Sequence, residues 1–195
     1  MWTLYEGDCL EVMPQLQDKS VDMILCDLPY GTTACKWDTI IPFEPLWAQY
    51  KRIIKDNGAI VLTASQPFTT DLINSNRKLF KYCWYWLKTK PNGFQHAKNK
   101  PMTIVEDVCV FSKAPMGHES LLGNKRMRYN PQGIYAIGKK TISKVKHGRT
   151  LGARKNQIGR EYEAFSGFPS NILEYQNITG SKAEHPTQKP VALFE

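Results

Sequence analysis

Blocks of apolar and polar positions predict alternating strands and helices over the first 113 residues of the chain. Residues 21–26 form a nearly continuous apolar run, which is typical of a strand buried on both faces of a parallel sheet. Over residues 43–54 the apolar side chains recur every three or four positions, as in an amphipathic helix that ends at Asn57-Gly58. The pattern therefore predicts an α/β fold with a largely parallel sheet. The other expected elements are strands over residues 2–5, 59–63, 80–87 and 104–111, and helices over residues 10–16 and 68–74.

From residue 114 onward the periodicity weakens, glycines become frequent and basic residues accumulate. Residues 1–113 carry 13 basic and 12 acidic side chains, whereas residues 114–182 carry 12 basic and 4 acidic ones, within a net charge of +8. We predict three parts: an α/β part over residues 1–113, an inserted basic region over residues 114–182, and a short third part over residues 183–195. Charge confined to one segment favours a polyanion such as nucleic acid as its partner, and a solvated lysine-rich loop is the alternative.

Composition removes several classes of protein. The 195 residues are 42% hydrophobic and 23% charged, which excludes a disordered or fibrous chain. No run approaches the roughly 18 apolar residues of a membrane span, and residues 1–20 lack the pattern of a signal peptide. The cysteines are odd in number and never form a C-x-x-C, so we expect reduced thiols in a cytoplasmic protein, without a disulfide frame or zinc site. They are Cys9, Cys26, Cys35, Cys83 and Cys109.

The segment Asp-Leu-Pro-Tyr-Gly at residues 27–31 directly follows the first buried strand. Ligands of open α/β sheets gather at the carboxyl ends of the strands, so this segment lies at the expected active-site edge. Asp27 accepts hydrogen bonds, and the fixed backbone of Pro29 leaves the Leu28 carbonyl free to face a ligand. Tyr30 offers a flat face for stacking. This combination suits an exocyclic amino group on an aromatic base, and a turn without function is the alternative.

Residues 27–31 resemble the D-P-P-Y-G motif of the amino-group DNA methyltransferases, with Leu28 in place of the first proline. Gly-Asp-Cys-Leu-Glu at residues 7–11 is similar to their G-D-x-L-E element, and His-Pro-Thr-Gln-Lys-Pro at residues 185–190 is the most specific match. The order of these motifs resembles the permuted beta class of phage and bacterial enzymes, whose target-recognition region lies between them, where residues 114–182 fall. Weaker matches occur at residues 20–24, 47–58 and 106–113.

This resemblance implies a Rossmann-like methyltransferase sheet and methyl transfer from S-adenosylmethionine to a flipped base in double-stranded DNA, without a metal. Asp27 and the Leu28 carbonyl would hold the target amine beside the rigid Pro29, and Tyr30 would stack on the base. Asp27 stands where cytosine-N4 enzymes often carry Ser, which favours adenine N6. The implied cofactor-binding residues are Asp8, Cys9, Asp27, His185, Thr187, Gln188 and Lys189, with Asp8 and Cys9 near the adenine and Lys189 near the carboxylate of the cofactor. The DNA-binding candidates are Lys125, Arg126, Arg128, Arg154, Lys155 and Arg160.

One element of the family has no counterpart here. The hexapeptide of these enzymes leads to a glycine-rich turn that holds the cofactor, and the present chain contains no G-x-G. We therefore expect a sheet that is incomplete at its C-terminal side, and either a complementing C-terminal half or a homodimer. A catalytically inactive DNA-binding or protein-interaction module derived from a methyltransferase is the alternative. Methylation of cytosine C5 would need a Pro-Cys loop, and RNA or protein-glutamine methyltransferases usually carry Asn at the position of Asp27, so both are less favoured.

Overall fold

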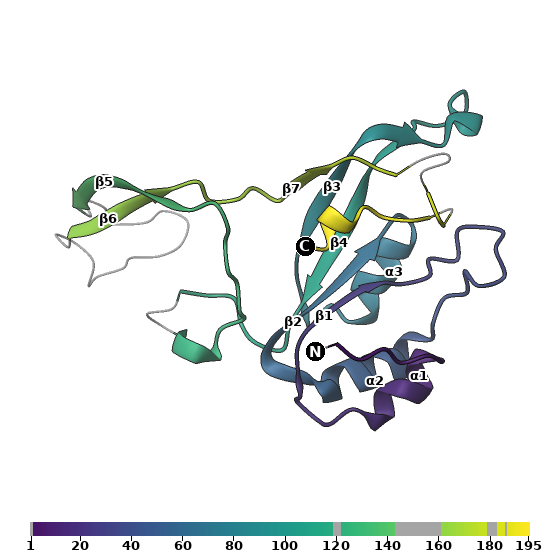
Figure 1. Ribbon diagram of the computed structural model, residues 1–195, viewed down its shortest axis with the longest axis horizontal. Helices are drawn as coiled ribbons and strands as arrows, with labels where there is room; N and C mark the ends of the chain where they lie inside the picture. Colours follow the sequence, from purple (N-terminus) through teal and green to yellow (C-terminus); the bar gives the residue numbers. More distant parts are fainter. Residues whose placement is uncertain (1, 119–121, 143–160, 179–182, 186) are drawn as a thin grey trace. The chain divides into compact units, whose positions relative to one another are not determined.

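The computed structural model describes residues 2–118, 122–142, 161–178, 183–185 and 187–195, which form two compact units (Figure 1). The first unit comprises Met1–Arg128 and Asn171–Glu195, and the second comprises Tyr129–Ser170. The second unit contains an antiparallel pair of strands, β5 (Tyr135–Ile142) and β6 (Glu161–Ser166). No helix among the described residues is long and apolar enough to cross a membrane.

Among the described residues, the first unit is built on a five-stranded sheet with the order β1-β2-β4-β3-β7. β1 is parallel to β2 and β3 is parallel to β7, but β4 is antiparallel to both of its neighbours, so the predicted largely parallel sheet is wrong in this respect. A connection of about ten residues joins β3 to β4, and so short a connection returns the chain antiparallel to the strand before it. The strands are β1 (Val21–Asp27), β2 (Ile54–Ala64), β3 (Phe80–Asn92), β4 (Thr103–Phe111) and β7 (Ile172–Tyr175).

Two helices, α2 (Phe43–Ile53) and α3 (Phe68–Ser75), confirm the amphipathic patterns. α2 ends at Ile53, earlier than predicted, because Ile54 already pairs with β1 as the first residue of β2. Gly58 belongs to this strand, where a Cβ atom would lie 2.6 Å from the Asp22 carbonyl oxygen. The expected helix over residues 10–16 is a short α1 (Cys9–Val12) that continues as a 3₁₀-helix (Met13–Gln15). Further 3₁₀ turns are η2 (Phe94–His96), η3 (Gly123–Lys125) and η5 (Val191–Leu193).

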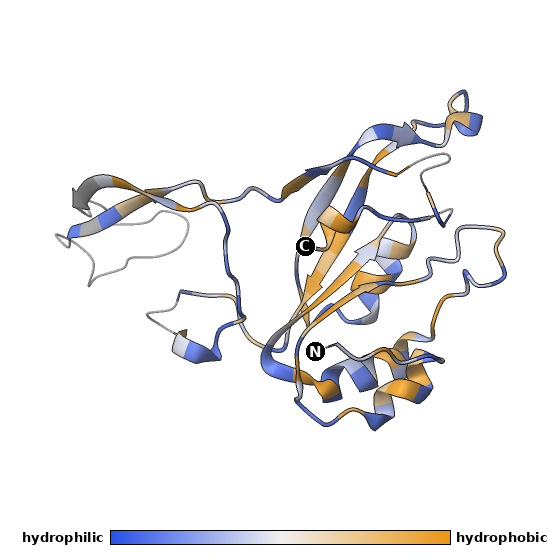
Figure 2. Ribbon diagram, viewed as in Figure 1, coloured by the Kyte–Doolittle hydropathy of each residue, from blue (hydrophilic) through white to orange (hydrophobic). Residues whose placement is uncertain are grey.

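The main hydrophobic core lies between the sheet and the helices α2 and α3 (Figure 2). Leu46 of α2 and Phe111 of β4 are fully buried, and Trp47 contacts Phe111 with ring centroids 4.9 Å apart. A smaller cluster on the other face of the sheet joins Val110 to Ala114 and Met127. Residues at both borders of the predicted 114–182 region belong to the first unit, and β7 is among them. The helices thus fix the sheet from one side, and its strand ends remain available for a site.

β1 differs from its prediction because it forms an edge of the sheet. Its inward residues pack on the core, but Met23 is 54% exposed and Leu25 is 36% exposed, so the strand is not buried on both faces. The expected strand at residues 2–5 is also absent, and Trp2 and Leu4 are 85% and 80% exposed. Met23 and Leu25 therefore leave apolar side chains uncovered on the face of β1 that turns away from the core.

Candidate active site

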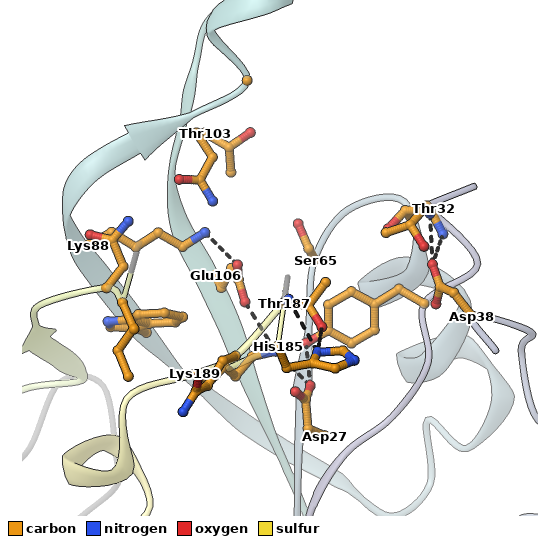
Figure 3. Close-up of a pocket in the computed structure, with 18 of the residues that line it drawn as sticks. Asp27, Thr32, Asp38, Ser65, Lys88, Thr103, Glu106, His185, Thr187 and Lys189 are labelled. Carbon is orange, nitrogen blue, oxygen red and sulfur yellow. Dashed lines mark hydrogen bonds and ion pairs between the residues drawn. The ribbon is translucent and has the colours of Figure 1, made fainter. Parts of the chain in front are cut away.

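A cavity of about 1220 Å³ lies in the first unit at the carboxyl end of β1 (Figure 3). Its lining comes from the loop after β1, from β3 and β4, and from the segment that precedes the C-terminal η5 turn. Two motifs more than 150 residues apart therefore meet here. The predicted site residues that line the cavity are Asp27, Leu28, Pro29, Tyr30, His185, Thr187, Gln188 and Lys189.

The loop after Tyr30 is held by a buried carboxylate, that of Asp38. Its oxygens accept hydrogen bonds from the backbone N–H groups of Gly31, Thr32 and Thr33 at 2.7–2.9 Å. Burial opposes ionisation, but the N–H groups of Gly31 and Thr33 outweigh it, and the pKa of Asp38 lies below its ordinary value. Gly31 has a φ of +67°, a conformation that side chains other than glycine rarely adopt. The sequence reasoning missed Asp38, although a glycine-threonine turn followed by Asp is a recognisable signal.

Asp27 is the last residue of β1, and three side chains donate hydrogen bonds to one of its oxygens. Thr63 Oγ1 lies 2.5 Å, Lys189 Nζ 2.6 Å and Tyr30 Oη 3.1 Å from Asp27 Oδ1. Thr63 is the β2 partner of Asp27 in the strand register and is buried, so the sheet itself places its hydroxyl. No described residue donates a hydrogen bond to Asp27 Oδ2, and 38% of the side chain is exposed. The carboxylate is therefore fixed through Oδ1, and Oδ2 remains an acceptor for a ligand.

The ring of Tyr30 forms part of the same cavity. It stacks on Phe68 of α3 with centroids 5.2 Å apart and an interplanar angle of 21°, and Lys189 Nζ lies over it at 5.1 Å from its centroid. Burial, reinforced by the charge of Asp27, raises the pKa of Tyr30 far above its ordinary value. Tyr30 therefore remains a neutral phenol that donates its O–H to Asp27.

A chain of alternating charges extends from Asp27 across the cavity floor. Lys189 Nζ also lies 3.7 Å from Glu106 Oε2, and Glu106 Oε1 forms an ion pair with Lys88 Nζ at 2.5 Å. The Lys88 side chain is 3% exposed, and Glu106 Oε2 is buried without a hydrogen-bond partner among the described residues. Sequence reasoning missed Lys88 and did not assign Glu106 to the site. The available signal was a lysine two positions after Trp86, on the same face of a largely apolar strand.

Other predicted residues lie outside this cavity. Asp8 caps α1 by accepting a hydrogen bond from the Leu10 N–H at 2.8 Å, and the adjacent Cys9 is half-buried, where burial raises its pKa. The resemblance places Lys189 near the carboxylate of the cofactor, whereas its ammonium lies on Asp27 in the structure. The cofactor-binding roles of these residues stay predictions.

The described DNA-binding candidates lie near the amino ends of β1 and β2. Lys125 lines a second cavity of about 620 Å³ together with Lys19, Lys55 and Lys113. Arg128 Nη1 lies 3.1 Å from Asp22 Oδ1 at the start of β1, whereas Asp27 ends the same strand. Arg126 follows η3 directly. The remaining candidates, Arg154, Lys155 and Arg160, lie outside the described residues.

The fold and the sequence of the chain are similar to those of known methyltransferases. The PvuII DNA methyltransferase, a cytosine-N4-specific enzyme, matches 97% of this chain and 66% of its own, with a TM-score of 0.54 and 14% identity. The chain therefore shares the Rossmann-like α/β fold of that protein. The type II methyltransferase M2.MboI of Moraxella bovis is 29% identical over 86 residues, which cover 33% of this chain and 32% of the relative. The M1.HpyAVI complex with S-adenosylmethionine gives a TM-score of 0.43 and 21% identity over 57% of this chain and 56% of that chain.

These matches confirm the resemblance to amino-group DNA methyltransferases and the Rossmann-like α/β fold that it implied. The matched segment spans about a third of the length of the curated relative. No family model matches the chain.

Proposed function

We propose that the chain carries the base-binding side of an S-adenosylmethionine-dependent DNA methyltransferase that acts on the exocyclic amine of a flipped base, adenine N6 in double-stranded DNA by preference. The observation that carries this proposal is the Asp27 carboxylate, fixed through Oδ1 by three donors while Oδ2 is open to the cavity. An acceptor beside the Tyr30 ring, in a space large enough for a nucleobase, matches the needs of a stacked amino base.

In methyl transfer to an amine, the main task of the protein is to position the amine and the methyl donor. Asp27 Oδ2 and the Leu28 carbonyl accept the two N–H groups of the target amine, which directs the nitrogen lone pair toward the incoming carbon. S-adenosylmethionine would supply the methyl carbon and keep the bonding pair on its sulfur as a neutral thioether, and Asp27 would accept the proton that the methylated amine loses. The ring of Tyr30 stacks on the base and so fixes the orientation of the base plane.

The residues of the cavity fit a sulfonium cofactor. The cavity already encloses a cation, the Lys189 ammonium, between the Asp27 and Glu106 carboxylates and over the Tyr30 ring. S-adenosylmethionine would supply a methyl group activated by positive charge, and the carboxylates that surround the Lys189 ammonium would attract such a charge. His185, Thr187 and Gln188 are the residues of this cavity that we propose to contact it.

The test is replacement of Asp27 by Ala. Removal of the acceptor should lower methyl transfer by at least about 100-fold, since transition-state contacts of this kind contribute factors of that size. DNA affinity should stay within about twofold, because affinity depends mainly on phosphate contacts. Asp71→Ala, on the exposed side of α3, is the matched control. Nucleoside analysis of the methylated DNA by mass spectrometry identifies N6-methyladenine or N4-methylcytosine, and unchanged turnover in Asp27→Ala would contradict the proposal.

We also propose a partner for the outer edge of β1. β1 is an edge strand, and Met23 and Leu25 on its uncovered face are 54% and 36% exposed, so another strand or an apolar segment can cover this surface. A complementing C-terminal half is the occupant that we favour, and a second copy of the chain is the alternative. Sedimentation of the isolated chain distinguishes the two, because only self-association changes its mass with concentration.

The second candidate function is a DNA-binding module without catalysis, which the 12 basic and 4 acidic side chains of residues 114–182 favour. Calorimetric titration with S-adenosylmethionine separates the two candidates. Heat at micromolar cofactor supports the enzyme, whereas a flat trace together with intact DNA binding supports the module.

A further inference from the structure

We propose that Lys189 determines which base the cavity accepts: its ammonium donates a hydrogen bond to the ring nitrogen next to the target amine. Asp27 would then accept an N–H of the target amine while Lys189 donates to the adjacent ring nitrogen, so the two side chains together recognise the H–N–C=N edge of an amino base. This inference rests on the proposed function, because it assumes that Asp27 accepts the target amine.

The donor and the acceptor lie side by side on one carboxylate. Lys189 Nζ is 2.6 Å from Asp27 Oδ1, and no described residue hydrogen-bonds the other oxygen, Oδ2. A lysine ammonium has three N–H donors, and its hydrogen bond to Asp27 uses one of them. A ligand edge that enters the cavity therefore meets an open acceptor, Asp27 Oδ2, next to a charged donor, Lys189 Nζ. Asp27 accepts the Tyr30 hydroxyl, and Lys189 Nζ lies over the ring of Tyr30, on which we expect the base to stack once Nζ moves to the edge of the ring.

This donor and acceptor pair is complementary to two of the four DNA bases. Adenine presents the N6 amine beside the acceptor N1, and cytosine presents the N4 amine beside the acceptor N3. Guanine and thymine present the reverse order, a carbonyl oxygen beside a ring N–H, which would place oxygen against the Asp27 carboxylate and N–H against the ammonium. Buried polar groups left unpaired in this way reject a ligand strongly. The pair therefore explains a site that suits amino bases as a class.

The surroundings of Lys189 show that it is held in the cavity. Its side chain is 7% exposed, whereas lysines normally extend into solvent. Glu106 Oε2, which is buried without a hydrogen-bond partner among the described residues, lies 3.7 Å from Nζ, and Lys88 fixes the other Glu106 oxygen. A shift of Nζ toward Glu106 would complete that ion pair and clear the face of Tyr30 for a base. Glu106 and Lys88 are thus positioning residues for Lys189.

The experiment compares the binding of two nucleosides that differ at one ring atom. Adenosine and 1-deazaadenosine, in which a C–H group replaces N1, are titrated by NMR into the wild-type chain, Lys189→Met and Lys189→Arg. We expect the wild type to bind adenosine about tenfold more tightly, since a hydrogen bond from a charged donor is worth about this factor or more. Lys189→Met should bind both nucleosides equally, and Lys189→Arg, which keeps a donor, should retain the preference. Lys100→Met removes another lysine of the same cavity and is the control.

Each outcome has a distinct meaning. A preference for adenosine that persists in Lys189→Met, or that the wild type lacks, overturns the role of Lys189 and leaves the proposed function standing, because adenosine still binds. Failure of the wild type to bind either nucleoside at millimolar concentration counts against the nucleobase cavity, and so against both proposals. Thermal unfolding of each variant establishes that it is folded. If the target proves to be cytosine, cytidine and 3-deazacytidine form the corresponding pair.

Discussion

At the scale of single residues, the Asp27 carboxylate is divided between two tasks. Its Oδ1 atom accepts hydrogen bonds from Thr63, Tyr30 and Lys189, whereas no described residue donates to its Oδ2 atom, which we propose to bind the ligand. Thr63 is the donor set by the backbone alone, because the parallel register of β1 and β2 places it opposite Asp27. An acceptor whose orientation is fixed before the base arrives needs no reorganisation during the reaction.

Replacement of Thr63 by Val tests this division. Valine keeps the shape of the buried side chain but removes the hydroxyl donor, so Asp27 should lose part of its fixed orientation. We expect kcat for methyl transfer to fall about 10- to 100-fold, in line with the cost of small misplacements in active sites, while KM for DNA stays unchanged. Thr63→Ser should restore most of the rate. A Val variant with the kcat of the wild type would assign Thr63 to packing only.

At the scale of elements, the two ends of the parallel strands carry different chemistry. The carboxyl ends hold the cavity with Asp27, whereas the amino ends hold a lysine-rich surface around Asp56 of β2. Lys19 Nζ and Lys113 Nζ lie 2.8 and 2.9 Å from the Asp56 oxygens, and these bonds lower the pKa of Asp56 to about 2. This carboxylate ties the residues before β1 and after β4 to the start of β2.

The lowered pKa of Asp56 makes the free energy of unfolding depend on pH in a defined range. An unfolded Asp titrates near 3.9, so the contribution of Asp56 is fully present above that pH and disappears as the pH falls toward about 2. Asp56→Asn should therefore lose less stability than the wild type between pH 4 and pH 2. Urea unfolding midpoints at pH 5, 3 and 2 measure the difference, with Asp71→Asn as the control. Parallel decreases in wild type and Asp56→Asn would show that the ion pairs contribute nothing.

At the scale of the whole molecule, charge and catalytic candidates occupy different parts of the sequence. The net charge of residues 1–113 is close to neutral, and the excess of basic side chains lies in residues 114–182. The described candidates Lys125 and Arg128 lie near the amino ends of β1 and β2, away from Asp27. Any contact of Lys125 and Arg128 with DNA would therefore lie on a part of the first unit separate from the cavity.

Salt dependence measures that role directly. Neutralising four basic residues of the region should weaken DNA binding and reduce the slope of log K against log salt by about 0.9 for each DNA phosphate that the variant no longer neutralises. A control that removes four charges from residues 1–113 should leave the slope nearly unchanged. An unaltered slope in the first variant would remove the region from the DNA surface. The test residues are Arg126, Arg128, Arg154 and Lys155, and the control residues are Lys51, Arg77, Lys78 and Lys81.

The local pattern of the sequence determined the elements with strong periodicity and the place of the loop over residues 27–31. The amphipathic pattern of α2 and the apolar runs of β1, β2 and β4 each predict an element, because side-chain periodicity follows from local backbone geometry. Asp27 follows an apolar strand, so its position at the carboxyl edge of the sheet was also predictable. Motif resemblance added the hexapeptide that ends in Lys189 and Pro190.

Only the tertiary structure decided how these parts meet. The pairing of β2 with β4, the position of β1 at the edge of the sheet, and the contacts of Asp27 with Thr63 and Lys189 depend on residues 36 to 162 positions apart. No local periodicity encodes such pairs, since they arise from strand order and register. The ion pair of Lys88 with Glu106 has the same origin, because two charges on neighbouring strands remain buried only when the fold brings them together.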